Sequence, residues 1–100
     1  MKNIKDPMEN ETLIVIADDH PIFRRGLRAM IESEADLKIA AEADNGETAF
    51  DLICEHEPDI AVLDLEMPQK DGFAVTEEIR RKNLATEVIF LTMHNNERIF

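Results

Sequence analysis

Three short, continuous apolar runs constrain the fold of this chain more than any other feature. They read LIVIA at residues 13–17, IAVL at 60–63 and VIFL at 88–91. A strand with one face in water alternates apolar and polar residues, whereas a strand covered on both faces is apolar throughout. The three runs therefore predict central strands of a sheet that carries helices on both faces.

Segments with helical periodicity separate these runs. An apolar stripe at helical spacing predicts a helix over about 21–33, and its members are Phe23, Leu27, Met30 and Ile31. A second helix carries the inner-face residues Ala49, Leu52 and Ile53 and ends near His56. A third is expected over 73–82, and the last residues, MHNNERIF, could open a fourth with Asn95 or Asn96 as its cap.

The order of the predicted elements defines the fold class. A less apolar strand at 36–43, DLKIAAEA, lies between the first two helices and suits a sheet edge. Strands that alternate with helices imply right-handed crossovers and a parallel sheet. We therefore expect an α/β fold with a doubly wound parallel sheet in the order 2-1-3-4, in which the first and third strands are neighbours.

Acidic residues follow two of these strands. Asp18 and Asp19 end the first strand and Asp64 ends the third, so their carboxylates should meet at the carboxyl edge of the sheet, where ligands bind. Carboxylates that repel one another require a proton or a cation, and Mg²⁺ suits such oxygen ligands. An Asp can also attack phosphorus. Thr92, which ends the fourth strand, would place a hydroxyl beside the same site.

Composition limits the partners of the chain. Its 100 residues carry a net charge of −11, which argues against binding nucleic acid by phosphate neutralisation and leaves room for cations and basic partners. The single cysteine, Cys54, rules out an intrachain disulfide. Residues 1–11 predict a loose tail without the apolar stretch of a secretion signal, and no run is long enough to span a membrane. We expect a cytoplasmic location and no membrane contact.

Three stretches together resemble the receiver domain of two-component response regulators. They are IVIADDHPIFRRGL, DIAVLDLEMPQKDG and VIFLTMH, and the resemblance covers residues 13–94. ADDHPIFRRGL is similar to the subclass whose receivers precede a DNA-binding helix-turn-helix domain of the LuxR type. The resemblance implies a flavodoxin-like fold, with contact to DNA only through an output domain.

The resemblance also implies roles for individual residues. Asp64 would accept a phosphoryl group from a phosphohistidine on a sensor histidine kinase, so the chain would be an acceptor and not a turnover enzyme. Asp19 would bind Mg²⁺ directly, Asp18 largely through water, and the backbone carbonyl of Glu66 would complete the protein ligands. Thr92 would contact the phosphoryl group and carry the switch.

The chain departs from the family pattern at its end. The pattern continues with a fourth helix, a fifth strand that ends in a phosphoryl-binding Lys, and a fifth helix, whereas the last residue here is Phe100. We therefore expect residues 12–100 to form a truncated receiver without the fifth strand and last helix. Phosphotransfer would be impaired in this piece alone. Self-association would follow through the exposed edge of the fourth strand.

Other functions stay open. A phosphatase of the haloacid-dehalogenase type also uses a strand-end Asp with Mg²⁺, but it needs a second Asp two places on, where Glu66 stands. A flavin-nucleotide module shares the expected fold, yet DDHP in its first loop would repel a phosphate. A receiver-like interaction module that is never phosphorylated is the third alternative.

Four basic residues follow the acids closely in the sequence, and none of them is expected to bind the metal. His20 is expected to be a loop residue, because Mg²⁺ prefers oxygen ligands. Arg24, Arg25 and Arg28 are expected on a wet helix face, with kinase docking as the alternative role.

Overall fold

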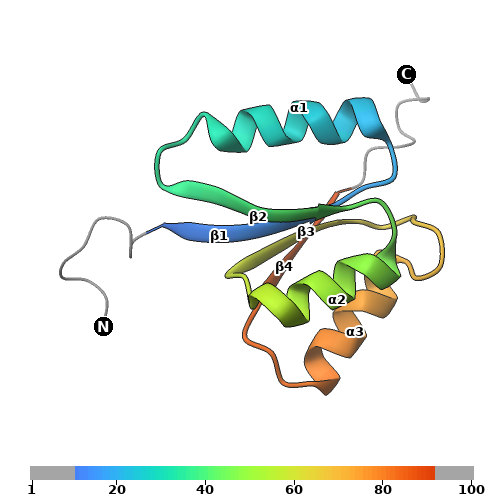
Figure 1. Ribbon diagram of the computed structural model, residues 1–100. Coiled ribbons are helices and arrows are strands. Elements are labelled where there is room, and N and C mark those ends of the chain that lie inside the picture. The colour runs from blue at the N-terminus through green and yellow to red at the C-terminus, as the bar shows by residue number, and fades with distance from the viewer. Residues whose placement is uncertain (1–10, 92–100) are drawn as a thin grey trace, which may run out of the picture.

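The computed structural model describes residues 11–91, and seven elements alternate along them. Figure 1 shows β1 (Thr12–Ala17), α1 (Pro21–Glu32), β2 (Leu37–Ala43), α2 (Gly46–His56), β3 (Ile60–Asp64), α3 (Gly72–Arg81) and β4 (Glu87–Leu91). The predicted order of strands and helices is confirmed. The predicted helix near Asn95 and Asn96, and residues 1–10 of the predicted tail, lie outside the described residues.

The four described strands form one parallel sheet in the order β2-β1-β3-β4. The predicted flavodoxin-like order is therefore confirmed. Helix α1 covers one face of the sheet, and α2 and α3 cover the other (Figure 1). Ala17 at the end of β1 pairs in register with Ala43 of β2 and Leu63 of β3. The residues that follow β1 and β3 are thereby brought to the same edge.

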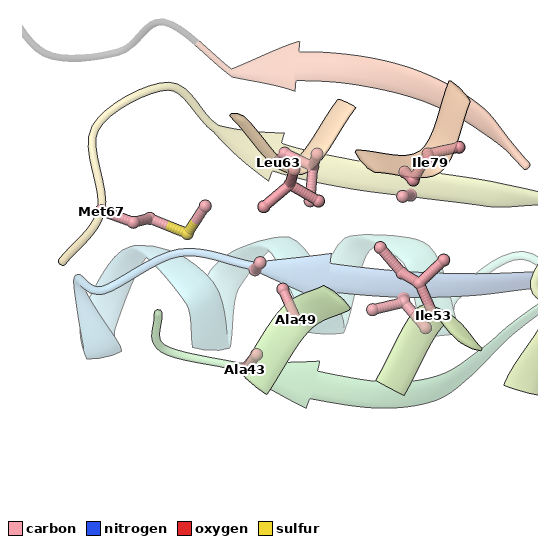
Figure 2. Close-up of a cluster of buried hydrophobic side chains, with 10 residues drawn as sticks. Ala43, Ala49, Ile53, Leu63, Met67 and Ile79 are labelled. Atoms are coloured by element: carbon pink, nitrogen blue, oxygen red, sulfur yellow. The ribbon is translucent and has the colours of Figure 1, made fainter. Parts of the chain in front are cut away.

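The core explains why the central strands are apolar without alternation. Alternate residues of β1 point to opposite faces of the sheet. Val15 and Ala17 belong to the larger cluster beneath α2 and α3, where Figure 2 shows Ile53, Leu63 and Ile79 packed together. The other face carries a smaller cluster beneath α1, formed by Ile14, Ile16, Ile31 and Val62. Both faces of β1 are buried, as its sequence predicts.

The starts of the helices are fixed locally. The side chains of Asn45 and Asp71 accept hydrogen bonds from Thr48 N and Ala74 N, both at 2.8 Å, and so cap α2 and α3. At α1, Pro21 occupies the first turn, where its missing N–H is not needed. His20 is the N-cap residue of α1, but its side chain makes no capping bond among the described residues. Its imidazole is therefore available for other contacts.

None of the helices in the described part of the chain is long and apolar enough to cross a membrane.

Candidate functional site at the carboxyl edge of the sheet

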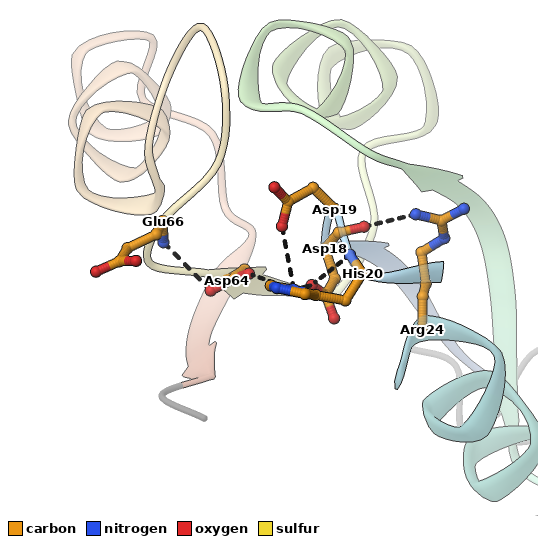
Figure 3. Close-up of polar contacts among 6 residues, drawn as sticks. All are labelled: Asp18, Asp19, His20, Arg24, Asp64 and Glu66. Atoms are coloured by element: carbon orange, nitrogen blue, oxygen red, sulfur yellow. Dashed lines mark hydrogen bonds and ion pairs between the residues drawn. The ribbon is translucent and has the colours of Figure 1, made fainter. Parts of the chain in front are cut away.

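Three carboxylates and one imidazole meet where β1 and β3 end. Ligand atoms of Asp18, Asp19, His20 and Asp64 all lie within 4.8 Å of one another. Figure 3 shows the side chains converging from the β1–α1 loop and from the end of β3. The structure thus brings together the three acids that the sequence predicted to meet, because the parallel order β2-β1-β3 places these strand ends side by side.

Asp18 is the buried member of the group. Its backbone N–H donates to Ala43 O at 3.0 Å, which extends the β1–β2 ladder by one bond. Its Oδ1 accepts from the backbone N–H of His20 at 3.1 Å. Its side chain is only 1% exposed, and Oδ2 has no hydrogen-bond partner among the described residues. A buried, unpaired carboxylate oxygen is costly, so this atom calls for a cation or a proton.

Asp64 is the last residue of β3 and is also buried. Its Oδ1 accepts from the backbone N–H of Glu66 at 3.2 Å. Burial, followed by the nearby Asp18 and Asp19, raises the pKa of the Asp64 carboxyl to about 6, and the Glu66 N–H offsets part of that rise. Asp64 is therefore largely ionised at neutral pH, but at a cost that a neighbouring cation would remove.

His20 lies closer to the acids than the sequence indicated. Its Nδ1 is 3.0 Å from Asp18 Oδ1, 3.1 Å from Asp19 Oδ1 and 3.7 Å from Asp64 Oδ2 (Figure 3). The hydrogen bond to Asp18 is the main cause of a raised His20 pKa. The predicted loop position is correct, whereas the shared contact with all three acids was missed. The signal was available: a His at an N-cap directly after two acids can fold back onto them.

Arg24 supports the same loop from α1. Its guanidinium donates to the backbone carbonyl of Asp18 and, through Nε, to Glu42 Oε1 of β2 at 3.2 Å. Arg28 reaches the other oxygen of Glu42 at 3.0 Å. The predicted wet face is therefore wrong for Arg24, whose side chain is 22% exposed, while Arg25 is exposed as expected. The missed signal was Glu42, which is an acid on the adjoining edge strand.

The loop between β3 and α3 is held close to the site by glycines. Gly46 N donates to Pro68 O at 3.3 Å, and a Cβ added at Gly46 would lie 1.8 Å from Lys70 O. A Cβ at Gly72 would lie 2.7 Å from Asp64 O. The loop therefore packs against α2 and against the end of β3 in a way that only glycine permits.

The two remaining predicted site residues are Glu66 and Thr92, and the structure describes only Glu66. Glu66 is exposed, and Figure 3 shows its side chain pointing away from Asp18 and Asp19. Its backbone N–H contacts Asp64, and the metal-binding role of its carbonyl stays a prediction. Thr92 lies outside the described residues.

The family model for the response regulator receiver domain matches residues 14–100. The chain therefore belongs to the response regulator receiver family. Within that family its relatives are regulators of the NarL and LuxR type.

The similarity to whole regulators is moderate in identity and partial in length. The chain is 34% identical over 96 residues to the probable transcriptional regulatory protein NarL of Mycobacterium tuberculosis strain H37Rv. That alignment covers 96% of this chain and 44% of the relative. It is 33% identical over 84 residues to the nitrate/nitrite response regulator protein NarL of Escherichia coli K12, with 84% and 39% covered. The chain thus spans less than half the length of these relatives.

Solved structures agree with the sequence comparison. The signal receiver domain of the putative response regulator NarL from Mycobacterium tuberculosis superposes with a TM-score of 0.83 at 36% identity, covering 90% of this chain and 73% of that one. A DNA-binding response regulator of the LuxR family from Staphylococcus aureus gives 0.78 at 36% identity, with 88% and 74% covered.

Proposed function

We propose that this chain is a phosphoacceptor and that Asp64 takes a phosphoryl group from a phosphohistidine on a sensor histidine kinase. The observation that carries the proposal is the position of the Asp64 carboxylate, at the open end of β3 and against Asp18 and Asp19. Family membership makes phosphoryl transfer the chemistry to expect from such a carboxylate.

In the proposed transfer, one Asp64 carboxylate oxygen attacks the phosphorus atom. The bond from phosphorus to the kinase imidazole nitrogen breaks, the imidazole keeps that electron pair and takes up a proton, and an acyl phosphate forms on Asp64. The attacking carboxylate must be ionised. A cation beside Asp18, Asp19 and Asp64 would favour that ionised form, because it offsets the burial and the neighbouring carboxylates that otherwise raise the pKa of Asp64.

The donor set fits Mg²⁺ as the proposed cofactor. Two buried oxygens, Asp18 Oδ2 and Asp19 Oδ1, have no hydrogen-bond partner among the described residues. We propose that Asp19 binds the ion directly, Asp18 largely through water, and Asp64 and the Glu66 backbone carbonyl at the remaining protein positions. The ion would neutralise charge on the phosphoryl oxygens. The chain itself holds the carboxylates in place and buries Asp18.

The output of the phosphorylated chain is proposed from its relatives. Thr92 would contact the phosphoryl group and turn inward, which biases the segment that follows β4. Several relatives are named as transcriptional regulatory proteins, and the chain spans less than half of their length. We therefore propose a cytoplasmic regulator that reaches DNA through an output domain, with the receiver acting as a switch and not as a turnover enzyme.

Intact-mass measurement after incubation with a small phosphodonor and Mg²⁺ tests the acceptor role. We expect one phosphoryl adduct on the unaltered chain, none on Asp64→Asn, and the adduct retained on Asp51→Asn, a control on the exposed side of α2. An adduct that survives Asp64→Asn would remove Asp64 from its role. Because phosphotransfer is expected to be impaired in this piece alone, the incubation is prolonged, and no adduct on any chain even then would favour an interaction module that is not phosphorylated.

We also propose self-association through the outer edge of β4. In the described part of the sheet, β4 pairs with β3 alone, and the Ile89 side chain is 51% exposed. Phe73 of α3 is 62% exposed and packs against Phe90 with the two rings tilted and their centroids 5.2 Å apart. Exposed apolar strand edges favour pairing with another chain. Light scattering should show dimers that Ile89→Lys abolishes, and a monomer at every concentration would contradict this.

A further inference from the structure

The imidazole of His20 adds a nitrogen donor to a site otherwise built from oxygen. Two of the acids lie almost equally close to it, with Asp18 Oδ1 at 3.0 Å and Asp19 Oδ1 at 3.1 Å from Nδ1. Adjacent ligands on a six-coordinate ion, each about 2.1 Å from the metal, lie about 3.0 Å apart. The spacing of Nδ1 from Asp19 Oδ1, the carboxylate oxygen proposed to bind directly, is thus that of two ligands on one small ion, and Asp64 Oδ2 follows at 3.7 Å.

Hydrogen bonding alone does not account for this arrangement. Nδ1 carries at most one proton, yet it faces three carboxylates. Asp19 Oδ1 is buried at 3.1 Å from Nδ1 but makes no hydrogen bond there, and Asp18 Oδ2 is buried without a partner among the described residues. Asp19 Oδ1 therefore lacks a donor in the place where the nitrogen lies, Asp18 Oδ2 lacks one in the same group of side chains, and a cation shared with Nδ1 would satisfy Asp19 Oδ1.

We propose that His20 Nδ1 is a metal ligand and that this site prefers divalent first-row transition ions, such as Mn²⁺, Co²⁺ and Ni²⁺, more strongly than an all-oxygen site would. Imidazole suits these ions, and affinity rises from Mn²⁺ to Ni²⁺, whereas Mg²⁺ favours oxygen. The inference rests on the metal site of the proposed function but not on phosphorylation. His20 would bind as the neutral ring, with its proton on Nε2, and its side chain is 58% exposed.

Metal affinities measured without a phosphodonor test this assignment. Calorimetric titrations with Mg²⁺ and with Ni²⁺ are compared for the unaltered chain, for His20→Ala, and for His56→Ala as a control at the far end of α2. We expect His20→Ala to weaken Ni²⁺ binding by roughly tenfold or more while Mg²⁺ binding changes little. His56→Ala should change neither. An unchanged ratio of Ni²⁺ to Mg²⁺ affinity in His20→Ala would overturn the proposal.

The opposite result is equally informative. If His20 only neutralises the acids and competes with the ion, His20→Ala will strengthen binding of both metals, which also overturns the assignment. Circular dichroism establishes that the variant is folded. Should it fail to fold, Co²⁺ added to the unaltered chain gives an independent reading by NMR. The ring protons of His20 should show the large paramagnetic shifts of a direct ligand, and their absence would refute the proposal.

These outcomes are separate from those of the proposed function. An Asp64 that accepts no phosphoryl group leaves the metal titrations intact. A His20 that binds no metal leaves the Asp64 adduct intact, since Mg²⁺ can be held by oxygen alone.

Discussion

The guanidinium of Arg24 donates a hydrogen bond to the backbone carbonyl of Asp18, and so links α1 directly to the buried acid. The same group also contacts Glu42 on the edge strand β2. One side chain therefore joins three elements: the β1–α1 loop, α1 and β2. Arg24 therefore holds the β1–α1 loop through its backbone, without a hydrogen bond to the side-chain carboxylate of Asp18.

Replacing Arg24 should therefore destabilise the chain. Arg24→Ala removes charge-assisted hydrogen bonds from a half-buried position, and we expect the free energy of unfolding to fall by about 1–3 kcal/mol. Arg25→Ala, one residue on and exposed, should change it by less than about 0.5 kcal/mol. Urea denaturation measures both. Equal effects of the two substitutions would show that the Arg24 contacts contribute nothing.

The close packing of the β3–α3 loop against α2 gives a second prediction. Gly46→Ala places a methyl group 1.8 Å from Lys70 O, so the backbone must move, and we expect a loss of about 2–4 kcal/mol. Gly26→Ala is the matched control, because nothing lies within 4 Å of its added Cβ in the middle of α1. It should stabilise the chain by about 0.5–1 kcal/mol. Thermal melting would show opposite signs for the two, and a stable Gly46→Ala variant would contradict the packing.

The acidic site predicts how stability depends on pH in the absence of metal. The Asp64 pKa is raised from 3.8 to about 6, so the folded chain holds that proton more tightly and loses stability as the pH rises between these values. The raised pKa of His20 has an effect of the same sign. Its contribution to the free energy of unfolding is fully present below pH 6.5 and is lost as the pH rises through the pKa of His20 in the folded chain. With a chelator present, urea denaturation should show lower stability at about pH 8 than at about pH 5.5. The reverse trend would contradict the assignment of both shifts.

Removing the charge of Asp64 should stabilise the metal-free chain. Asp64→Asn abolishes a buried carboxylate that lies beside two others, and at about pH 8 we expect a gain of about 1–3 kcal/mol. Saturating Mg²⁺ should reduce the difference in free energy of unfolding between Asp64→Asn and the unaltered chain. The ion stabilises the folded unaltered chain more, because that chain is expected to bind it more tightly. Denaturation with and without Mg²⁺ measures both effects. If Asp64→Asn were less stable than the unaltered chain in the absence of metal, the result would show that the Asp64 carboxylate supports the fold.

The fold followed from sequence because its signals are local and agree with one another. The LIVIA and IAVL runs mark strands buried on both faces, and the helical stripes between them require crossovers. From that order the meeting of Asp18 and Asp64 is a geometric consequence. The register shift between Ile14 and Val15 carried no such signal. It depends on how two twisted strands pair, and not on the pattern of either one.

The sequence signals for the basic residues, a His directly after two acids and Glu42 on the adjoining strand, do not fix their contacts by themselves. The position of His20 depends on the rotation of a side chain at an N-cap, and the partner of Arg24 depends on which face of β2 carries Glu42. Both are settled by packing between elements that are distant in sequence. The general preference of Mg²⁺ for oxygen ligands predicts that His20 is only a loop residue, and this preference says nothing about its contacts with the adjacent acids.

Chemical mapping of the phosphorylated residue tests the central claim most directly. Borohydride converts an aspartyl phosphate into homoserine, which peptide mass spectrometry can assign to one position. After treatment with a small phosphodonor and Mg²⁺, we predict homoserine at Asp64 and at neither Asp18 nor Asp19, with none formed when the metal is chelated. Homoserine at Asp18 or Asp19, or modification that persists without metal, would contradict the account.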